Sequence, residues 1–264
     1  MNPEIYNKII LKKEFSKLPK IDVEKCWKNF EKRQTSDEEK IKLCRDLLRK
    51  SFFAFGSLKL LNPKIIEKRN SDWILKKHIS TRERFCFYPE LYKKIFSDFK
   101  KEKNISVIDL GCGINGFSYN FFKKNVDYVG VESVGQLVDL TNNYFEKEKI
   151  LGMVFHESLF EIEKIKNLIR KTNFPRIIFL FKVLDSLEMI EKNFSKKLLK
   201  EIIPLADFVV ISFATKSLIS RKGFNVKRYW FENFLKEMKC KIENDFEEFG
   251  ERYILLKFLL KCNK

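Results

Sequence analysis

Short runs of apolar residues, separated by polar turns, recur along the chain from residue 105 to the C-terminal end. They predict strands at 105–110, 127–132, 152–156, 176–181, 207–213, 241–248 and 252–261, with helices between the first five. The last two runs are joined only by a short link around Phe249 and Gly250, so they should pair as a hairpin. Strand–helix alternation that ends in a hairpin predicts an α/β fold with a seven-stranded, mostly parallel sheet and an antiparallel edge strand.

The first 77 residues instead carry apolar positions at helical spacing. Ser36 followed by Glu39 is a capping box, which favours a helix that starts there. Ser80 and Glu83 form a second capping box, ahead of the helix that leads into the first strand. We therefore expect an all-helical N-terminal domain over residues 1–77 and a second domain over residues 78–264.

The chain carries a formal net charge of +17, from 53 basic and 36 acidic residues. The excess is uneven: residues 1–104 hold 27 Lys and Arg against 15 Asp and Glu, whereas the remaining residues hold 26 against 21. A basic surface of this kind indicates an acidic polymer, such as a nucleic acid, as the partner. The N-terminal helices are expected to supply much of that surface.

Cysteine and histidine usage bounds the chemistry. The six cysteines are scattered without a C-x-x-C pair, and the two histidines stand apart. This arrangement argues against a metal site and, without a secretory signal, against structural disulfides. No apolar run approaches the roughly 18 residues that a membrane-spanning helix needs. We expect a reduced, cytoplasmic, monomeric protein that is not bound to a membrane.

The first predicted strand ends in a turn whose residues suit a nucleotide-like ligand. Asp109 is followed by Gly111 and Gly113, and about twenty residues later a second strand ends at Glu132. The glycines let the backbone approach a ligand closely, and the acid can accept both hydroxyls of a ribose. The D-x-G-x-G form is similar to motif I of class I S-adenosylmethionine methyltransferases.

Four further segments extend this resemblance. They are residues 78–84 (HISTRER), 181–184 (FKVL), 210–218 (VISFATKSL) and 229–232 (YWFE). Together with the turn around Asn115, they resemble the Arm/Rmt (FmrO-type) family of 16S rRNA (guanine-N7) methyltransferases, which confer aminoglycoside resistance. The resemblance is continuous from about residue 78 to residue 255 and is weaker in the N-terminal region.

The resemblance implies a class I methyltransferase (Rossmann-like) fold behind a basic helical domain. It also implies S-adenosylmethionine as the cofactor and the small ribosomal subunit, through its 16S rRNA, as the partner. Arg84 is expected to hold the cofactor's carboxylate and the pair Glu157 and Ser158 to meet its adenine. The expected cofactor-binding residues are Arg84, Asp109, Gly111, Gly113, Asn115, Glu132, Ser133, Glu157 and Ser158. The expected RNA-binding residues are Lys12, Lys13, Lys17, Lys20, Lys216, Arg221 and Lys222.

Some positions depart from the family pattern. The family commonly has proline where this chain has Gly116, Asp185 and Ala214, and its basic loop after residue 218 is longer. These departures flank the cofactor and the RNA-facing edge, so the target nucleotide stays open. A resistance role does not follow from the resemblance.

The reaction asks little of side chains. The N7 atom of guanine has a free lone pair, so it can accept a methyl group without first losing a proton. No general base is evident, and His156 is interpreted as an ordinary strand residue; we expect catalysis by positioning and assign no catalytic side chain. Two alternatives stay open: a methyltransferase that acts on another RNA position or on a tRNA, and a ribosome assembly factor with little turnover.

Overall fold

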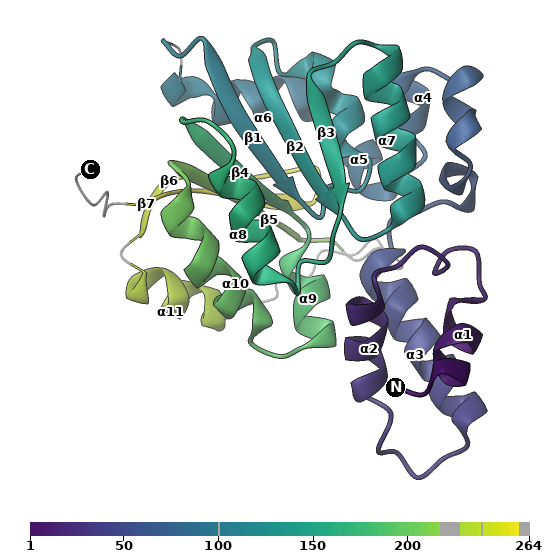
Figure 1. Ribbon diagram of the computed structural model, residues 1–264. Coiled ribbons are helices and arrows are strands. Elements are labelled where there is room, and N and C mark those ends of the chain that lie inside the picture. Colours follow the sequence, from purple (N-terminus) through teal and green to yellow (C-terminus); the bar gives the residue numbers. More distant parts are fainter. Residues whose placement is uncertain (100, 217–227, 239, 259–264) are drawn as a thin grey trace.

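The computed structural model describes residues 1–99, 101–216, 228–238 and 240–258. Its centre is a seven-stranded sheet with the order β3-β2-β1-β4-β5-β7-β6 (Figure 1). The strands are β1 (Asn104–Leu110), β2 (Asn125–Glu132), β3 (Gly152–His156), β4 (Arg176–Phe181), β5 (Phe208–Ala214), β6 (Cys240–Glu248) and β7 (Glu251–Phe258). The seven predicted strands and the class I methyltransferase topology are confirmed.

Strand direction divides the sheet into two parts. Strands β1 to β5 pair in parallel, whereas β7 is antiparallel both to β5 and to the edge strand β6. The antiparallel strand therefore lies next to the edge, and the predicted hairpin forms that side of the sheet. All six residues of β4 are buried, as expected for a central parallel strand that is covered on both faces.

Helices cover both faces of the sheet (Figure 1). One face carries α4 (Ser71–Leu75), α5 (Ile79–Arg84), α6 (Tyr88–Ile95), the 3₁₀ helix η5 (Asn115–Phe121) and α7 (Gly135–Lys147). The other carries α8 (Ile162–Arg170), α9 (Leu184–Ile190), α10 (Phe194–Ile202) and α11 (Tyr229–Glu237). No helix of the described residues is both long and apolar enough to cross a membrane.

The N-terminal helices α1 (Pro3–Ile10), α2 (Lys20–Lys28) and α3 (Asp37–Phe52) form a unit of their own beside the sheet (Figure 1). The next segments, η1 (Leu58–Leu61) and η2 (Pro63–Glu67), pack on α7, and α4 packs on η5. Residues 58–75 therefore belong with the sheet. The boundary at residue 77 stays a prediction, and this packing favours a boundary near residue 54.

The two capping boxes have different outcomes. The backbone N–H of Glu39 donates to Ser36 Oγ at 3.3 Å, so Ser36 caps α3 as predicted. The second capping box is wrong: α5 begins after His78, which provides no side-chain cap, and Ser80 is buried inside the helix. The neighbouring Thr81 hydroxyl instead donates to the carbonyl of Leu75 at 2.5 Å, which ties α5 to α4.

The N-terminal unit lies against the edge where the parallel strands end. Gln136 Nε2, at the start of α7, donates to the Lys13 carbonyl at 2.8 Å, and the Gly135 N–H donates to the Lys17 carbonyl at 3.2 Å. Farther along, Asn29 Nδ2 donates to the Ile190 carbonyl, in α9, at 3.0 Å. The segment that joins α1 to α2 is therefore held at the carboxyl ends of β2 and β3, where ligands bind in folds of this class.

Candidate active site

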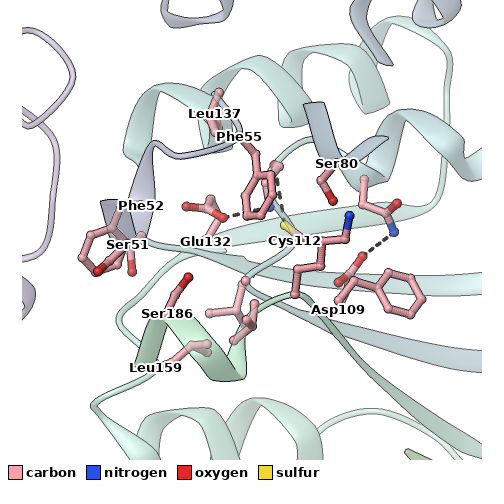
Figure 2. Close-up of a pocket in the computed structure, with 18 of the residues that line it drawn as sticks. Ser51, Phe52, Phe55, Ser80, Asp109, Cys112, Glu132, Leu137, Leu159 and Ser186 are labelled. Carbon is pink, nitrogen blue, oxygen red and sulfur yellow. Dashed lines mark hydrogen bonds between the residues drawn. The ribbon is translucent and has the colours of Figure 1, made fainter. Parts of the chain in front are cut away.

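A pocket opens at the carboxyl ends of β1, β2 and β4. Its walls combine the turn after β1, the ends of β2 and β4, helix α5, and residues of the N-terminal unit. Figure 2 shows Asp109 and Ser80 toward one end of the pocket, and Ser51, Phe52 and Leu159 toward the other. Seven of the nine residues expected to bind the cofactor line this pocket: Arg84, Asp109, Gly111, Gly113, Asn115, Glu132 and Ser133. An eighth, Ser158, lies behind the wall, where its hydroxyl donates to the lining residue Asp22.

The turn after β1 depends on its two glycines. Gly111 has φ +70° and Gly113 has φ +54°, in the left-handed region that side chains disfavour. A Cβ atom on Gly111 would also lie 2.3 Å from Val183 Cγ2, so this strand end leaves no room for a larger residue. The motif therefore brings the backbone close to the pocket, where the N–H groups of Gly111 and Cys112 donate to the Val131 carbonyl.

A buried hydrogen-bond network supports this turn from behind. Asp109 Oδ2 accepts from Asn115 Nδ2 at 2.7 Å and from the Tyr128 hydroxyl at 2.8 Å, and the Tyr88 hydroxyl donates to Asn115 Oδ1 at 2.7 Å. Burial raises the pKa of Asp109 to about 6, although its two hydrogen bonds oppose the rise. Asp109 and Asn115 therefore order the turn.

Glu132, at the end of β2, is the acid of the pocket's central part (Figure 2). Its Oε2 accepts from the Gly113 N–H and its Oε1 from the Val134 N–H, each at 2.8 Å. Burial raises the pKa of Glu132, and these backbone N–H groups partly lower it again. Each oxygen keeps a second lone pair, so the carboxylate can also accept from ligand hydroxyls.

A cluster of buried charges lies where the cofactor's carboxylate was expected. Arg84 Nη1 pairs with Glu251 Oε1 at 3.0 Å, and Lys182 Nζ lies 3.1 Å from Glu251 Oε2 and 2.6 Å from Glu83 Oε2. Burial alone would raise the pKa of Glu251, but Arg84 and Lys182 hold it below its usual value. Both cations line the pocket, so the structure places a second cation beside the expected Arg84 and gives both an acidic partner.

The expected adenine-binding pair separates in the structure. The Glu157 side chain is 30% exposed, lies outside the pocket lining and pairs with Lys164 at 3.1 Å. Ser158 is fully buried, and its hydroxyl donates to Asp22 Oδ1, in α2 of the N-terminal unit. His156 is exposed and contacts the Ser133 carbonyl at 3.0 Å, outside the pocket, as an ordinary strand residue would.

Five of the expected RNA-binding residues are described, and all five are exposed. Four of them, Lys12, Lys13, Lys17 and Lys20, follow α1 or begin α2, beside the carboxyl edge of the sheet. Lys17 also pairs with Asp139 of α7 at 2.5 Å. Lys216 follows β5, and its side chain packs on Gly250. Arg221 and Lys222 lie outside the described residues.

Sequence reasoning missed three charged residues of the site: Lys182 and Asp22, which line the pocket, and Glu251, which pairs with the cations Arg84 and Lys182. Lys182 lies in the FKVL segment, so the motif carried a signal that its side chain matters. Glu251 follows the hairpin turn on β7, and a buried acid opposite Arg84 has no local signature. Asp22 is one acid on a basic helix more than eighty residues before the cofactor turn, so only the folded chain shows that it lines the pocket.

Comparison with known families identifies the chain. The profile of the ribosomal RNA methyltransferase (FmrO) family matches residues 55–238, which include the cofactor turn, the ends of β2 and β4, and helix α5. The chain belongs to this family. The resemblance to the Arm/Rmt (FmrO-type) methyltransferases is thereby confirmed, and residues 1–54, which form the N-terminal unit, precede the matched region.

Individual relatives agree with this placement. A 16S rRNA (guanine(1405)-N(7))-methyltransferase of Proteus mirabilis is 27% identical over 225 residues, which cover 74% of this chain and 70% of the relative. The crystal structure of the 16S rRNA methyltransferase RmtF in complex with S-adenosyl-L-homocysteine superposes with a TM-score of 0.79 at 19% identity, over 98% of this chain and 99% of RmtF. The 16S rRNA methylase RmtB superposes with a TM-score of 0.75 at 19% identity, over 97% of each chain. These solved structures have the same fold across the N-terminal unit as well.

Proposed function

We propose that this protein transfers a methyl group from S-adenosylmethionine to N7 of a guanine in the 16S rRNA of the small ribosomal subunit. The observation that carries the proposal is the pocket. Its sheet-side walls fall within the family match, and they hold seven of the nine residues that were expected to bind the cofactor. The Proteus mirabilis relative is named for N7 of guanine 1405 in 16S rRNA, which supports the choice of atom. The target proposed for this protein lies near the decoding region. We further propose that the protein acts as a monomer in the cytoplasm, where its substrate lies.

The residues of the pocket fit S-adenosylmethionine. Glu132 has lone pairs for ribose hydroxyls beside a turn of backbone N–H groups, and Leu137 and Leu159 supply apolar walls. Asp22 brings a carboxylate oxygen without a hydrogen-bond partner among the described residues. At the other end, Arg84 and Lys182 are cations that a ligand carboxylate can contact, in competition with Glu251.

The bound cofactor supplies an electrophilic methyl group on a sulfonium sulfur. The protein's residues then have to bind, orient and exclude water, because guanine N7 needs no deprotonation before attack. The titratable groups of the pocket agree with a mechanism that needs no general base and no nucleophilic side chain. Burial lowers the pKa of His78 to about 3, so its ring is neutral, and burial raises the pKa of the Cys112 thiol far above its usual value, so it is no nucleophile. Asp109 is occupied by Asn115 and Tyr128.

The basic residues around the pocket edge fit a substrate that is a folded RNA surface. Contacts of lysine side chains with phosphates add affinity and orientation but carry no base identity. We propose that Lys12, Lys13, Lys17 and Lys20 of the N-terminal unit and Lys216 after β5 make such contacts. The same surface then places one guanine at the pocket mouth.

The test is nucleoside analysis of small ribosomal subunits after incubation with the protein and S-adenosylmethionine. N7-methylguanine is expected in 16S rRNA, with one new site of reduction- and aniline-induced cleavage, because N7 methylation labilises the modified nucleotide. A Glu132→Gln variant is the matched control and should give little product. A product of methylated adenine or cytosine would refute the atom assignment, modification of tRNA alone would refute the substrate, and tight subunit binding without any product would favour an assembly factor.

A further inference from the structure

Asp22 is a fully buried acid that the N-terminal unit contributes to the cofactor pocket. It lies in the first turn of α2, is 0% exposed and lines the pocket. Its Oδ1 accepts from the Ser158 hydroxyl, whereas its Oδ2 has no hydrogen-bond partner among the described residues. A buried carboxylate oxygen without a donor is costly, so a donor supplied by a ligand would be stabilising.

The position of Asp22 along the pocket points to the kind of donor. Glu132 ends β2, and Ser158, which holds Asp22, follows the neighbouring strand β3. This part of the pocket is lined by Leu137, Leu159 and Phe160, which are suited to the faces of a flat aromatic ring. Apolar walls with a carboxylate acceptor between them therefore suit a ring that carries an exocyclic N–H group.

Glu157, the acid that was expected to meet the adenine, does not reach this part of the pocket. Glu157 precedes Ser158, but its side chain is directed to Lys164 at 3.1 Å and lies outside the pocket lining. Asp22 is thus the carboxylate that reaches the pocket at the end of β3, although it comes from a different part of the chain.

We propose that Asp22 accepts a hydrogen bond from the exocyclic amino group of the cofactor's adenine, so that the N-terminal unit sets adenine specificity. The inference rests on the proposed function for the identity of the cofactor. It has a structural consequence: the cofactor binds at the contact between the N-terminal unit and the methyltransferase part. That contact already includes the hydrogen bond from Gln136 to the Lys13 carbonyl and the ion pair of Lys17 with Asp139. Cofactor binding therefore adds a contact to the same unit that carries the proposed RNA-binding lysines.

The test compares two ligands that differ in the hydrogen-bonding edge of the base. S-adenosylhomocysteine carries the exocyclic amine beside an unprotonated N1, and S-inosylhomocysteine carries a carbonyl oxygen in place of the amine and a proton on N1. Calorimetry on the full-length protein should show that S-adenosylhomocysteine binds about 10- to 100-fold more tightly, the range for a hydrogen bond to a charged group. In Asp22→Ala this preference should fall below about threefold. In Asp22→Asn, whose amide can donate to the carbonyl oxygen, the preference should fall or reverse while the shape of the side chain is kept.

Two control variants separate the role of Asp22 from general effects. Glu157→Gln changes the acid outside the pocket, and Asp139→Asn loosens the contact between the N-terminal unit and α7; both should keep the wild-type ligand preference. An unchanged preference in Asp22→Ala and Asp22→Asn, or a wild-type protein that binds the two ligands equally, would overturn the inference. The proposed function is judged separately by nucleoside analysis, because an Asp22-dependent preference without N7-methylguanine would leave this inference standing and refute the acceptor.

Discussion

Replacement of Glu251 by Gln should destabilise the free protein and, at the same time, tighten the binding of S-adenosylhomocysteine. In the free protein, the Glu251 carboxylate is 1% exposed and is the shared partner of Arg84 and Lys182. The Ser212 hydroxyl also donates to it. Glutamine keeps the size and one carbonyl oxygen but removes the negative charge. Arg84 then loses its acidic partner, and Lys182 is left with Glu83, whose side chain is 34% exposed.

The size of the effect follows from burial. Removal of one partner of a buried ion pair typically costs about 3–5 kcal/mol, because the remaining charge stays in a medium that solvates it poorly. A domain of this size loses about 2–4 °C in melting temperature per kcal/mol, so a decrease of roughly 6–20 °C is expected. The matched control, Glu83→Gln, should cost much less because its carboxylate is partly solvated and contacts only one of the cations.

The cofactor's carboxylate should restore what the substitution removes. If Arg84 and Lys182 hold that carboxylate, Glu251→Gln frees them from a competitor, and the thermal stabilisation by S-adenosylhomocysteine should exceed that of the wild type. 5′-Methylthioadenosine, which has no amino-acid carboxylate, should show no such gain. Equal gains for the two ligands, or an unchanged melting temperature, would refute the assignment of this cluster to the carboxylate.

The pH dependence of the melting temperature gives an independent check that the charge of Glu251 stabilises the folded protein. The folded-state pKa of Glu251 lies below the unfolded value of 4.5, so its stabilising contribution is present above about pH 4.5 and is lost as the pH falls through the folded pKa. The difference in melting temperature between wild type and Glu251→Gln should therefore be greatest near neutral pH and narrow in acid.

Four further predictions follow from the same geometry. Glu132→Gln should weaken S-adenosylhomocysteine about 10- to 100-fold by calorimetry, whereas Glu157→Gln should not. Burial raises the pKa of Asp22 to about 7; Glu132 and Glu161 add to the rise, and Ser158 and Ser133 oppose it. The free energy of unfolding should therefore fall by on the order of 4 kcal/mol as the pH rises from about 4 to 7, because the buried carboxyl has to ionise. Urea titrations across this window should show Asp22→Asn gaining stability relative to the wild type. A truncated protein that starts at residue 55 should fail to bind S-adenosylhomocysteine, because Asp22, Ser51 and Phe52 line the pocket; full affinity would show that the N-terminal unit is dispensable there. Joint replacement of Lys12 and Lys13 by Gln should weaken binding to small ribosomal subunits and make the affinity less dependent on salt concentration. Lys171→Gln changes an exposed lysine that precedes the amino end of β4, and it should leave both the affinity and its salt dependence unchanged.

The N-terminal unit shows where local reasoning was insufficient. Its basic helices could be recognised from their charge, which predicted a helical domain with a surface for an acidic partner. In the structure, the same unit closes the pocket with Asp22 and Phe52 and is held to α7 through Gln136. Charge composition describes a surface, but it does not show which face of a helix is buried against another part of the chain.

The sheet, the glycine turn after β1 and the family could be recognised from the amino-acid sequence alone. Strands buried on both faces have continuous apolar runs, and left-handed turns at Gly111 and Gly113 require glycine, so these features depend on a few neighbouring residues. The pairing of Arg84 with Glu251, the turning of Glu157 away from the pocket and the entry of Asp22 into it were decided only by the tertiary structure. Each of these depends on which distant side chain shares a buried space, and burial, unlike periodicity, leaves no local trace for an isolated charged residue.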